Sequence, residues 1–164
     1  MSRQIFALAL AFGTLLVPAT NAQQRPDFSG TWTMDEARSD SSTHEGFVGP
    51  VTWLIRQSAR QLVVDIKRGP KSMTLNFTIY DKPPGGPASA GVPSYVAYWV
   101  GDTLVTETAQ NIQGQTVTSK EIRTLQTGGQ QMDVARTVQV EHGYTLRRGQ
   151  NYSTAKDVFI KGAP

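Results

Sequence analysis

Asp27-Phe28-Ser29-Gly30-Thr31-Trp32 is the stretch of sequence that decides the fold. It follows an apolar leader and begins the part of the chain that must fold. Its Gly30-Thr31-Trp32 core is typical of the first strand of a small β-barrel. We therefore expect a first strand over residues 28–34, followed by a polar segment that reaches residue 50.

The leader has the features of a secretory signal. Arg3 is positively charged, an apolar run follows over residues 5–17, and Thr20-Asn21-Ala22 offers small residues for cleavage. The apolar run is too short to cross a bilayer, which takes about 20 residues. We expect removal of residues 1–22, with a cut after Ala19 as the alternative. A single domain would then span residues 23–164 and be exported in soluble form, to a periplasm or to the medium, without a membrane anchor.

The composition excludes several classes of protein. The chain has no cysteine, which rules out disulfides, thiol catalysis, thiolate metal sites and a lipid-modified cysteine. The net charge is only +3, and the basic residues make one loose cluster, too sparse for a nucleic-acid binder. A chain of this length can bury one core without a cofactor. His44 and His142 lie in separate loops, so we expect no metal site. The members of the loose basic cluster are Arg56, Arg60, Lys67, Arg68 and Lys71.

Alternation of apolar and polar residues runs through most of the mature chain and indicates β-strands. It is clearest over residues 73–80, where Met73, Leu75, Phe77 and Ile79 share one face, which we expect to point at the core. Residues 82–93 are rich in proline and glycine and predict a loop within the domain. Successive short turns favour an all-β, antiparallel up-and-down meander of eight to ten strands that closes into a barrel.

Two turns fix the register of two hairpins. Gly101-Asp102 pairs Trp99 with Leu104 and Tyr98 with Val105, but both faces are apolar, so either Trp99 or Tyr98 could face inward. Gly128-Gly129 joins strands over residues 116–127 and 130–141. Its register places ten side chains on one face in five pairs: Leu125 and Met132, Arg123 and Val134, Glu121 and Arg136, Ser119 and Val138, Val117 and Val140.

The first strand and the later hairpins resemble secreted bacterial lipocalin-like domains, which are calycin-type β-barrels. The similarity rests on residues 27–40, on Trp99-Val100-Gly101-Asp102-Thr103-Leu104-Val105 and on the turn over residues 125–132. It implies that Gly30 permits a close approach at the barrel floor. It also implies that Trp32 closes this floor by packing on an arginine from a late strand, either Arg147 or Arg148. The chain has no recognisable T-D-Y motif and continues for a further strand after these arginines.

Three charges on the inner face of the second hairpin suggest a binding site. Glu121 and Arg136 can satisfy one another, which leaves Arg123 in surplus inside the barrel. An inward arginine without a carboxylate suits an anionic ligand head. We therefore predict a pocket for a small amphipathic anion, with Arg123 and Arg136 at its polar end and an apolar wall. The predicted wall residues are Trp53, Phe77 and Trp99. In the alternative, the strand end opens, Arg123 reaches solvent, and Glu121 with Arg136 is a structural pair.

The sequence thus favours an exported barrel that binds a small molecule such as a fatty acid. The second hypothesis is a non-catalytic structural or protein-interaction module, inhibitor-like, that works through its loops over residues 35–50 and 82–93. An enzyme is the least favoured class, because only Glu121 or Glu107 could be its acid or base and neither has a recognisable catalytic partner. A lumen of ligand size would favour the carrier, and a lumen filled by large side chains would favour the module.

Overall fold

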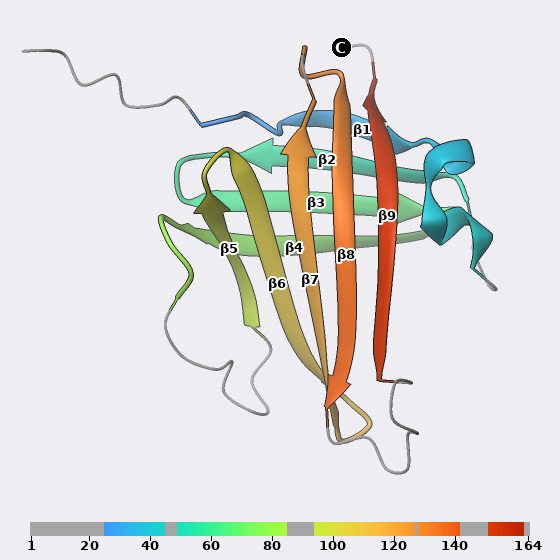
Figure 1. Ribbon diagram of the computed structural model, residues 1–164, viewed down its shortest axis with the longest axis vertical. Coiled ribbons are helices and arrows are strands. Elements are labelled where there is room, and N and C mark those ends of the chain that lie inside the picture. The colour runs from blue at the N-terminus through green and yellow to red at the C-terminus, as the bar shows by residue number, and fades with distance from the viewer. Residues whose placement is uncertain (1–24, 45–48, 85–93, 127, 142–150, 163–164) are drawn as a thin grey trace, which may run out of the picture.

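A closed β-barrel is formed by the part of the chain that this computed structural model describes, residues 25–44, 49–84, 94–126, 128–141 and 151–162 (Figure 1). Neighbouring strands pair in sequence order, and the last strand pairs with the first. This confirms the predicted all-β meander. The described strands are β1 Gly30–Met34, β2 Val51–Gln57, β3 Gln61–Arg68, β4 Lys71–Tyr80, β5 Ser94–Val100, β6 Thr103–Ile112, β7 Gln115–Leu125, β8 Gln131–Glu141 and β9 Tyr152–Lys161.

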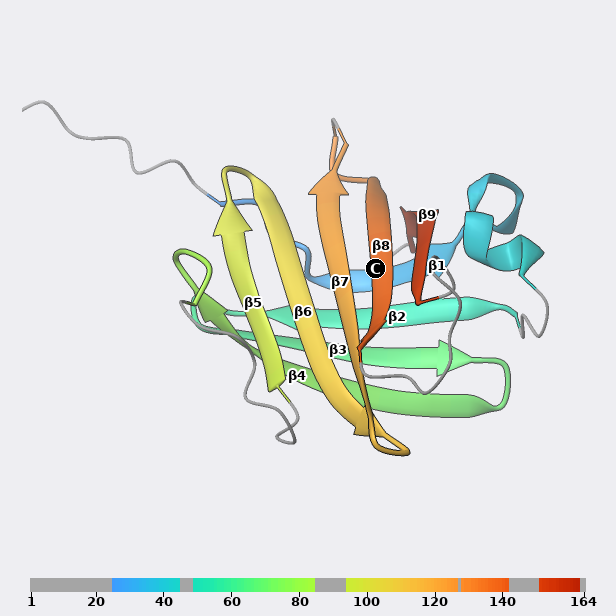
Figure 2. The same ribbon diagram turned by 60° about the horizontal axis from the view of Figure 1, so that its bottom comes forward.

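The barrel is built from two groups of strands that cross. In Figure 1, β1 to β4 run across the view behind β5 to β9, which run from top to bottom. Figure 2 shows the same crossing from another side. Two short 3-10 helices, η1 Glu36–Arg38 and η2 Asp40–Thr43, follow β1 and pack against β9. In the β1–β4 group, the β2–β3 turn lies at one end of the strands and the β3–β4 turn lies at the other end.

The two predicted hairpin registers are confirmed. Trp99 pairs with Leu104 across a turn in which Gly101 has φ 59°. Arg123 pairs with Val134 and Glu121 with Arg136, across a turn whose two glycines have φ 87° and 65°. Positive φ values of this kind cost glycine nothing. The turn chemistry therefore determines which residues share the inner face of the hairpin.

One pair of strands departs from the antiparallel expectation. β4 and β5 pair in parallel, with Thr78 beside Val96 and Tyr80 beside Tyr98. Parallel neighbours need a long connection that returns the chain, whereas antiparallel neighbours can be joined by a tight turn. The segment between Tyr80 and Ser94 supplies that length.

Large apolar side chains form a buried core inside the barrel. Trp99 belongs to this core, whereas Tyr98 lies on the outer face, where its hydroxyl donates to Glu107 Oε1 at 2.7 Å. The face predicted from residues 73–79 enters the core only in part, since Met73 is 52% exposed beside the β3–β4 turn. The buried core residues are Phe28, Trp32, Met34, Val51, Trp53, Ile55, Leu62, Val64, Phe77, Ile79, Ala97, Trp99, Leu104, Met132, Val134 and Phe159.

Candidate functional site

The barrel floor is closed around Trp32. This side chain is fully buried, and its Nε1 donates to the carbonyl of Phe28 at 2.8 Å. The Nζ of Lys161, which pairs with Trp32 across β1 and β9, lies 5.3 Å from the centre of the indole ring. Gly30 has φ 134°, and a Cβ there would lie 2.6 Å from Lys161 Cε. Lys161 therefore supplies a cation over Trp32, a role that the sequence had suggested for an arginine.

Arg147 and Arg148, the arginines suggested for that role, lie outside the described residues. A second cation covers the same end of the barrel, because Arg25 lies 5.2 Å from the ring centre of Trp99 and pairs with Asp81 at 2.8 Å. Trp99 also packs against Phe28, with ring centres 6.3 Å apart. Trp99, a predicted wall residue of the pocket, thus forms part of the closed end.

Arg123 is buried in the interior, with 1% of its surface exposed. Its NH1 donates to the hydroxyl of Thr106 at 2.5 Å, and its NH2 contacts Glu121. Its guanidinium carbon lies 5.2 Å from the ring centre of Trp53. The Nε atom has no hydrogen-bond partner in the described part of the chain. Arg123 therefore does not reach solvent, which contradicts that part of the alternative, whereas the Glu121–Arg136 pair that the alternative also expected is present.

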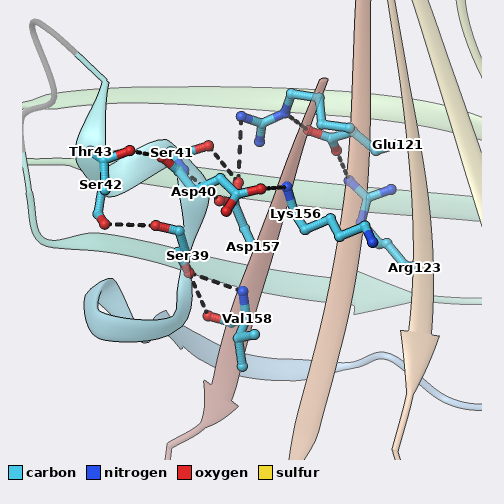
Figure 3. A network of polar contacts seen from close by, with 11 residues as sticks. Ser39, Asp40, Ser41, Ser42, Thr43, Glu121, Arg123, Lys156, Asp157 and Val158 are labelled. Atoms are coloured by element: carbon cyan, nitrogen blue, oxygen red, sulfur yellow. Dashed lines mark hydrogen bonds and ion pairs between the residues drawn. The ribbon is translucent and has the colours of Figure 1, made fainter. Parts of the chain in front are cut away.

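Glu121 joins Arg123 to a longer network (Figure 3). Its second oxygen accepts a hydrogen bond from Nε of Arg136 at 2.8 Å, and NH1 of Arg136 lies 3.8 Å from Asp157 Oδ2. Asp157 is 1% exposed and accepts two further hydrogen bonds from Ser41 in η2, from the backbone N at 2.9 Å and from the hydroxyl at 2.7 Å. The network thus runs from β7 through β8 and β9 to η2.

The network balances the charge of Arg123, which the sequence predicted to be in surplus. Glu121 pairs with Arg123 as well as with Arg136, and Asp157 adds a second carboxylate. Two guanidinium groups face two carboxylates, so Arg123 is not in surplus. Asp157 was missed because it lies on β9, outside the hairpin whose register the turn determines; the pairing of Val134 with Asp157 places it on the same inner face.

The network shifts the pKa values of its members. Burial favours the neutral form of Glu121, but Arg123 and Arg136 outweigh that effect and hold the pKa of Glu121 below its usual value. Burial lowers the pKa of Arg123, Glu121 opposes this, and Arg136 adds to the lowering. A guanidinium stays protonated under all ordinary conditions. The group is therefore a set of charges that satisfy one another inside the barrel.

A pocket of about 340 Å³ opens beside this network, next to the β3–β4 turn. Trp53, Ile66 and Met73 form its apolar lining, and its polar lining comes from Arg136 together with Arg68, Lys71 and Ser72. Among the described residues, the pocket therefore lies at the end of β3 and β4 that carries their turn.

The structure brings only some of the predicted site residues to this pocket. Trp53 and Arg136 line it. Glu121 is not part of the lining but accepts a hydrogen bond from Arg136. Arg123 is not part of its lining, and Phe77 packs edge-on against Tyr95 in the core, with ring centres 6.0 Å apart. The sequence thus identified one cation and one apolar side chain of the pocket.

Arg68 and Lys71 are functional candidates that were not predicted to belong to the site. In the sequence they stand out only as members of the loose basic cluster. They pair directly across the β3–β4 turn, and both are exposed. Within the described ranges, neither side chain forms a hydrogen bond or an ion pair. The signal available in the sequence was the run from Lys67 to Met73, which has three cations and no acidic residue.

The described residues give no indication of a metal centre or a membrane helix. No group of three histidine, aspartate or glutamate side chains in that part of the chain is placed to hold a metal ion. His142, one of the two histidines, lies outside the described residues. Among the described segments, none is a helix with the length and apolar character needed to cross a bilayer.

Comparison with known proteins identifies the fold. No protein-family model and no curated sequence matches the chain. Apo lipid binding protein 8 of Caenorhabditis elegans superposes with a TM-score of 0.50 at 14% identity, over 82% of this chain and 95% of that one. The fluorescent protein UnaG gives a TM-score of 0.49 at 17% identity, over 82% and 97% of the two chains. Human cRBP IV gives 0.48 at 14% identity, over 84% and 99%. The chain therefore shares the closed β-barrel fold of this lipid binding protein.

Proposed function

We propose that this protein binds a small amphipathic anion of the fatty-acid type in the pocket beside the β3–β4 turn. One observation carries the proposal: an apolar wall of Trp53, Ile66 and Met73 faces a polar side that contains three cations. An apolar tail gains from burial against such a wall, and an anionic head gains from the cations.

Arg136 is the residue best placed to receive the head group. Glu121 holds its Nε at 2.8 Å, which fixes the plane of the guanidinium at the pocket wall. Guanidinium nitrogens suit a carboxylate because they can donate two parallel hydrogen bonds. Arg123 does not contact the head group but supports Arg136 indirectly, because it binds the other oxygen of Glu121. The proposal thus keeps the predicted ligand class and changes the role of Arg123 from contact to support.

The size of the pocket limits the ligand. Ligand pockets commonly measure about 300–1,000 Å³, and the 340 Å³ here lies at the lower end of that range. A short or medium acyl chain fits this volume better than a bulky ring system. The fold is compatible with such a ligand, since a protein named as a lipid binding protein shares it, but the pocket residues carry the proposal.

Calorimetric titration with decanoate tests the binding site. We expect saturable binding to the wild type and loss of binding in Met73→Trp, because Met73 is 52% exposed and a larger side chain there fills the pocket. Leu54→Trp is the matched control, since Leu54 is 41% exposed and does not line this pocket. Arg136→Gln should weaken binding about tenfold or more, as expected for a charged hydrogen bond.

Native mass spectrometry of protein purified from the cells that express it gives a second test. A retained lipid or organic acid would support the proposal. If no acid is retained, and if decanoate binds neither the wild type nor the Leu54→Trp control, the protein is not a carrier of amphipathic anions.

We also propose export, on the basis of the leader over residues 1–22. The mature protein would begin at Gln23. The intact mass of the protein from its natural source checks this directly, because retention of the leader would give the mass of the full chain.

A further inference from the structure

We propose that the pocket selects a head group with two negative charges, of the phosphate monoester class, over a head group with one. The inference rests on the proposed function and specifies the chemistry of its ligand. It follows from the charges around the pocket, which divide into an inner set with no net charge and an outer set with a net positive charge.

The inner set does not require an anion. Arg123 and Arg136 face Glu121 and Asp157, and both carboxylates are bonded within the network. A single-charge ligand that enters at Arg136 therefore meets a guanidinium that is already neutralised in part.

The outer set consists of Arg68 and Lys71. Their positions are opposite each other in the β3–β4 register, both line the pocket, and neither has a side-chain partner in the described part of the chain. The positive charge of Arg68 also acts on the inner set, because it helps to lower the pKa of Glu121. The outer set thus leaves two positive charges to be balanced, and a dianion balances both.

The donors also suit a tetrahedral head. Arg136, Arg68 and Lys71 come from three different strands, β8, β3 and β4. A phosphate monoester offers three acceptor oxygens, whereas a carboxylate offers two in one plane. Donors that approach from several strands match the first geometry better.

A comparison of decyl phosphate with decyl sulfate tests the charge requirement at constant shape. Both have a tetrahedral head on the same tail, but the sulfate has one charge at any working pH, whereas the phosphate gains its second charge near pH 6. At pH 8 and low salt we expect decyl phosphate to bind about tenfold more tightly, from two largely exposed cations. At pH 5 the preference should fall to about twofold, because only about a tenth of the phosphate then has its second charge. At high salt the preference should also shrink.

The sulfate also controls for titration of the protein. In the described part of the chain, the charged groups around the pocket are Arg68 on β3, Lys71 on β4, Glu121 on β7, Arg136 on β8 and Asp157 on β9. Any change in their charge between pH 5 and pH 8 affects both ligands, so only the ratio of the two affinities reports the second ligand charge.

Arg68→Gln, with Arg60→Gln as its matched control, tests whether the preference for phosphate depends on Arg68. Arg68→Gln should lower the phosphate preference to about threefold, whereas Arg60→Gln should leave it at about tenfold. Arg60 is also an exposed arginine, but it lies in the β2–β3 turn, at the opposite end of β3. Inorganic phosphate serves as a third arm, and we expect it to bind far more weakly than decyl phosphate because it lacks the tail.

The outcomes separate the two proposals. Equal affinity for decyl phosphate and decyl sulfate at pH 8 overturns the inference, and the binding of an amphipathic anion still stands. An equal loss of preference in Arg68→Gln and Arg60→Gln also overturns it, because general surface charge then explains the effect. Tight binding of inorganic phosphate alone would overturn it as well, since it would identify a free-phosphate site. If none of the tailed ligands binds, the proposed function itself fails.

Discussion

Glu121→Gln should be among the most damaging single changes in the barrel. The substitution keeps the shape of the side chain but removes the one negative charge that binds both Arg123 and Arg136. Arg123 is 1% exposed and would lose its ionic partner, keeping the hydroxyl of Thr106 and at most the neutral amide oxygen of the glutamine as hydrogen-bond acceptors among the described residues. Removal of one partner from a buried ion pair costs about 3–5 kcal/mol. Since Arg136 is partly exposed and can regain water, we expect the lower end, about 3 kcal/mol.

Urea unfolding followed by tryptophan fluorescence measures this loss. With a slope of about 2 kcal/mol/M, typical of small domains, 3 kcal/mol lowers the midpoint by about 1.5 M. Glu107→Gln is the matched control, because Glu107 pairs with Lys120 on the outer face and its side chain is 34% exposed. We expect that control to cost less than about 1 kcal/mol. If Glu121→Gln costs no more than Glu107→Gln, the inner charges are solvated and the network does not hold the barrel together.

The difference between wild type and Glu121→Gln should depend on pH. The pKa of Glu121 in the folded protein lies below its usual value of about 4.3. Its ionised form therefore adds stability in full above the unfolded-state pKa, and that stability is lost as the pH falls through the folded-state pKa. The two unfolding midpoints should consequently converge as the pH is lowered from 7 towards 3. A gap that stays constant over this range would show that the charge of Glu121 contributes nothing.

Three further changes test the barrel floor and the link to η2. Gly30→Ala should cost about 2 kcal/mol in urea unfolding, because its φ of 134° disfavours other residues and its Cβ would meet Lys161; adding Lys161→Ala should recover only the part due to the clash. Lys161→Met alone should cost about 0.5–1 kcal/mol through the lost cation contact with Trp32, again by urea unfolding. Asp157→Asn should weaken the hold on Ser41 and speed hydrogen exchange of the Ser41 amide, whereas unchanged exchange would contradict that link.

The hairpin registers could be predicted because local chemistry determines them. A two-residue turn with glycine at positive φ fixes the pairing of its flanking residues. The period of two then assigns every later residue to a face. The shared inner face of Glu121, Arg123 and Arg136 follows from these two rules alone. The choice between Trp99 and Tyr98 could not be made in the same way, because both strand faces are apolar and only closure of the barrel decides which one is inside.

The features that the sequence did not reveal depend on contacts between distant segments. Lys161 meets Trp32 only because β9 closes on β1. The parallel pairing of β4 with β5 depends on the path of a long connection, which alternation does not encode. Arg68 and Lys71 become part of a site only when β3 and β4 curve towards Arg136 on β8. In each case the residue type was visible, but its partner lay on a strand far away in the sequence.

Asp157 shows most clearly how this limit affects a functional argument. Charges counted on one hairpin gave an unpaired Arg123 and pointed to a ligand anion deep in the barrel. The next strand adds a carboxylate to the same inner face, so the deep charges already balance without a ligand. The positive charge that an anion could balance lies further out, on Arg68 and Lys71, which form no ion pair in the described part of the chain. A buried charge indicates a ligand only after every strand that faces it has been counted, and in a closed barrel those strands include the last one.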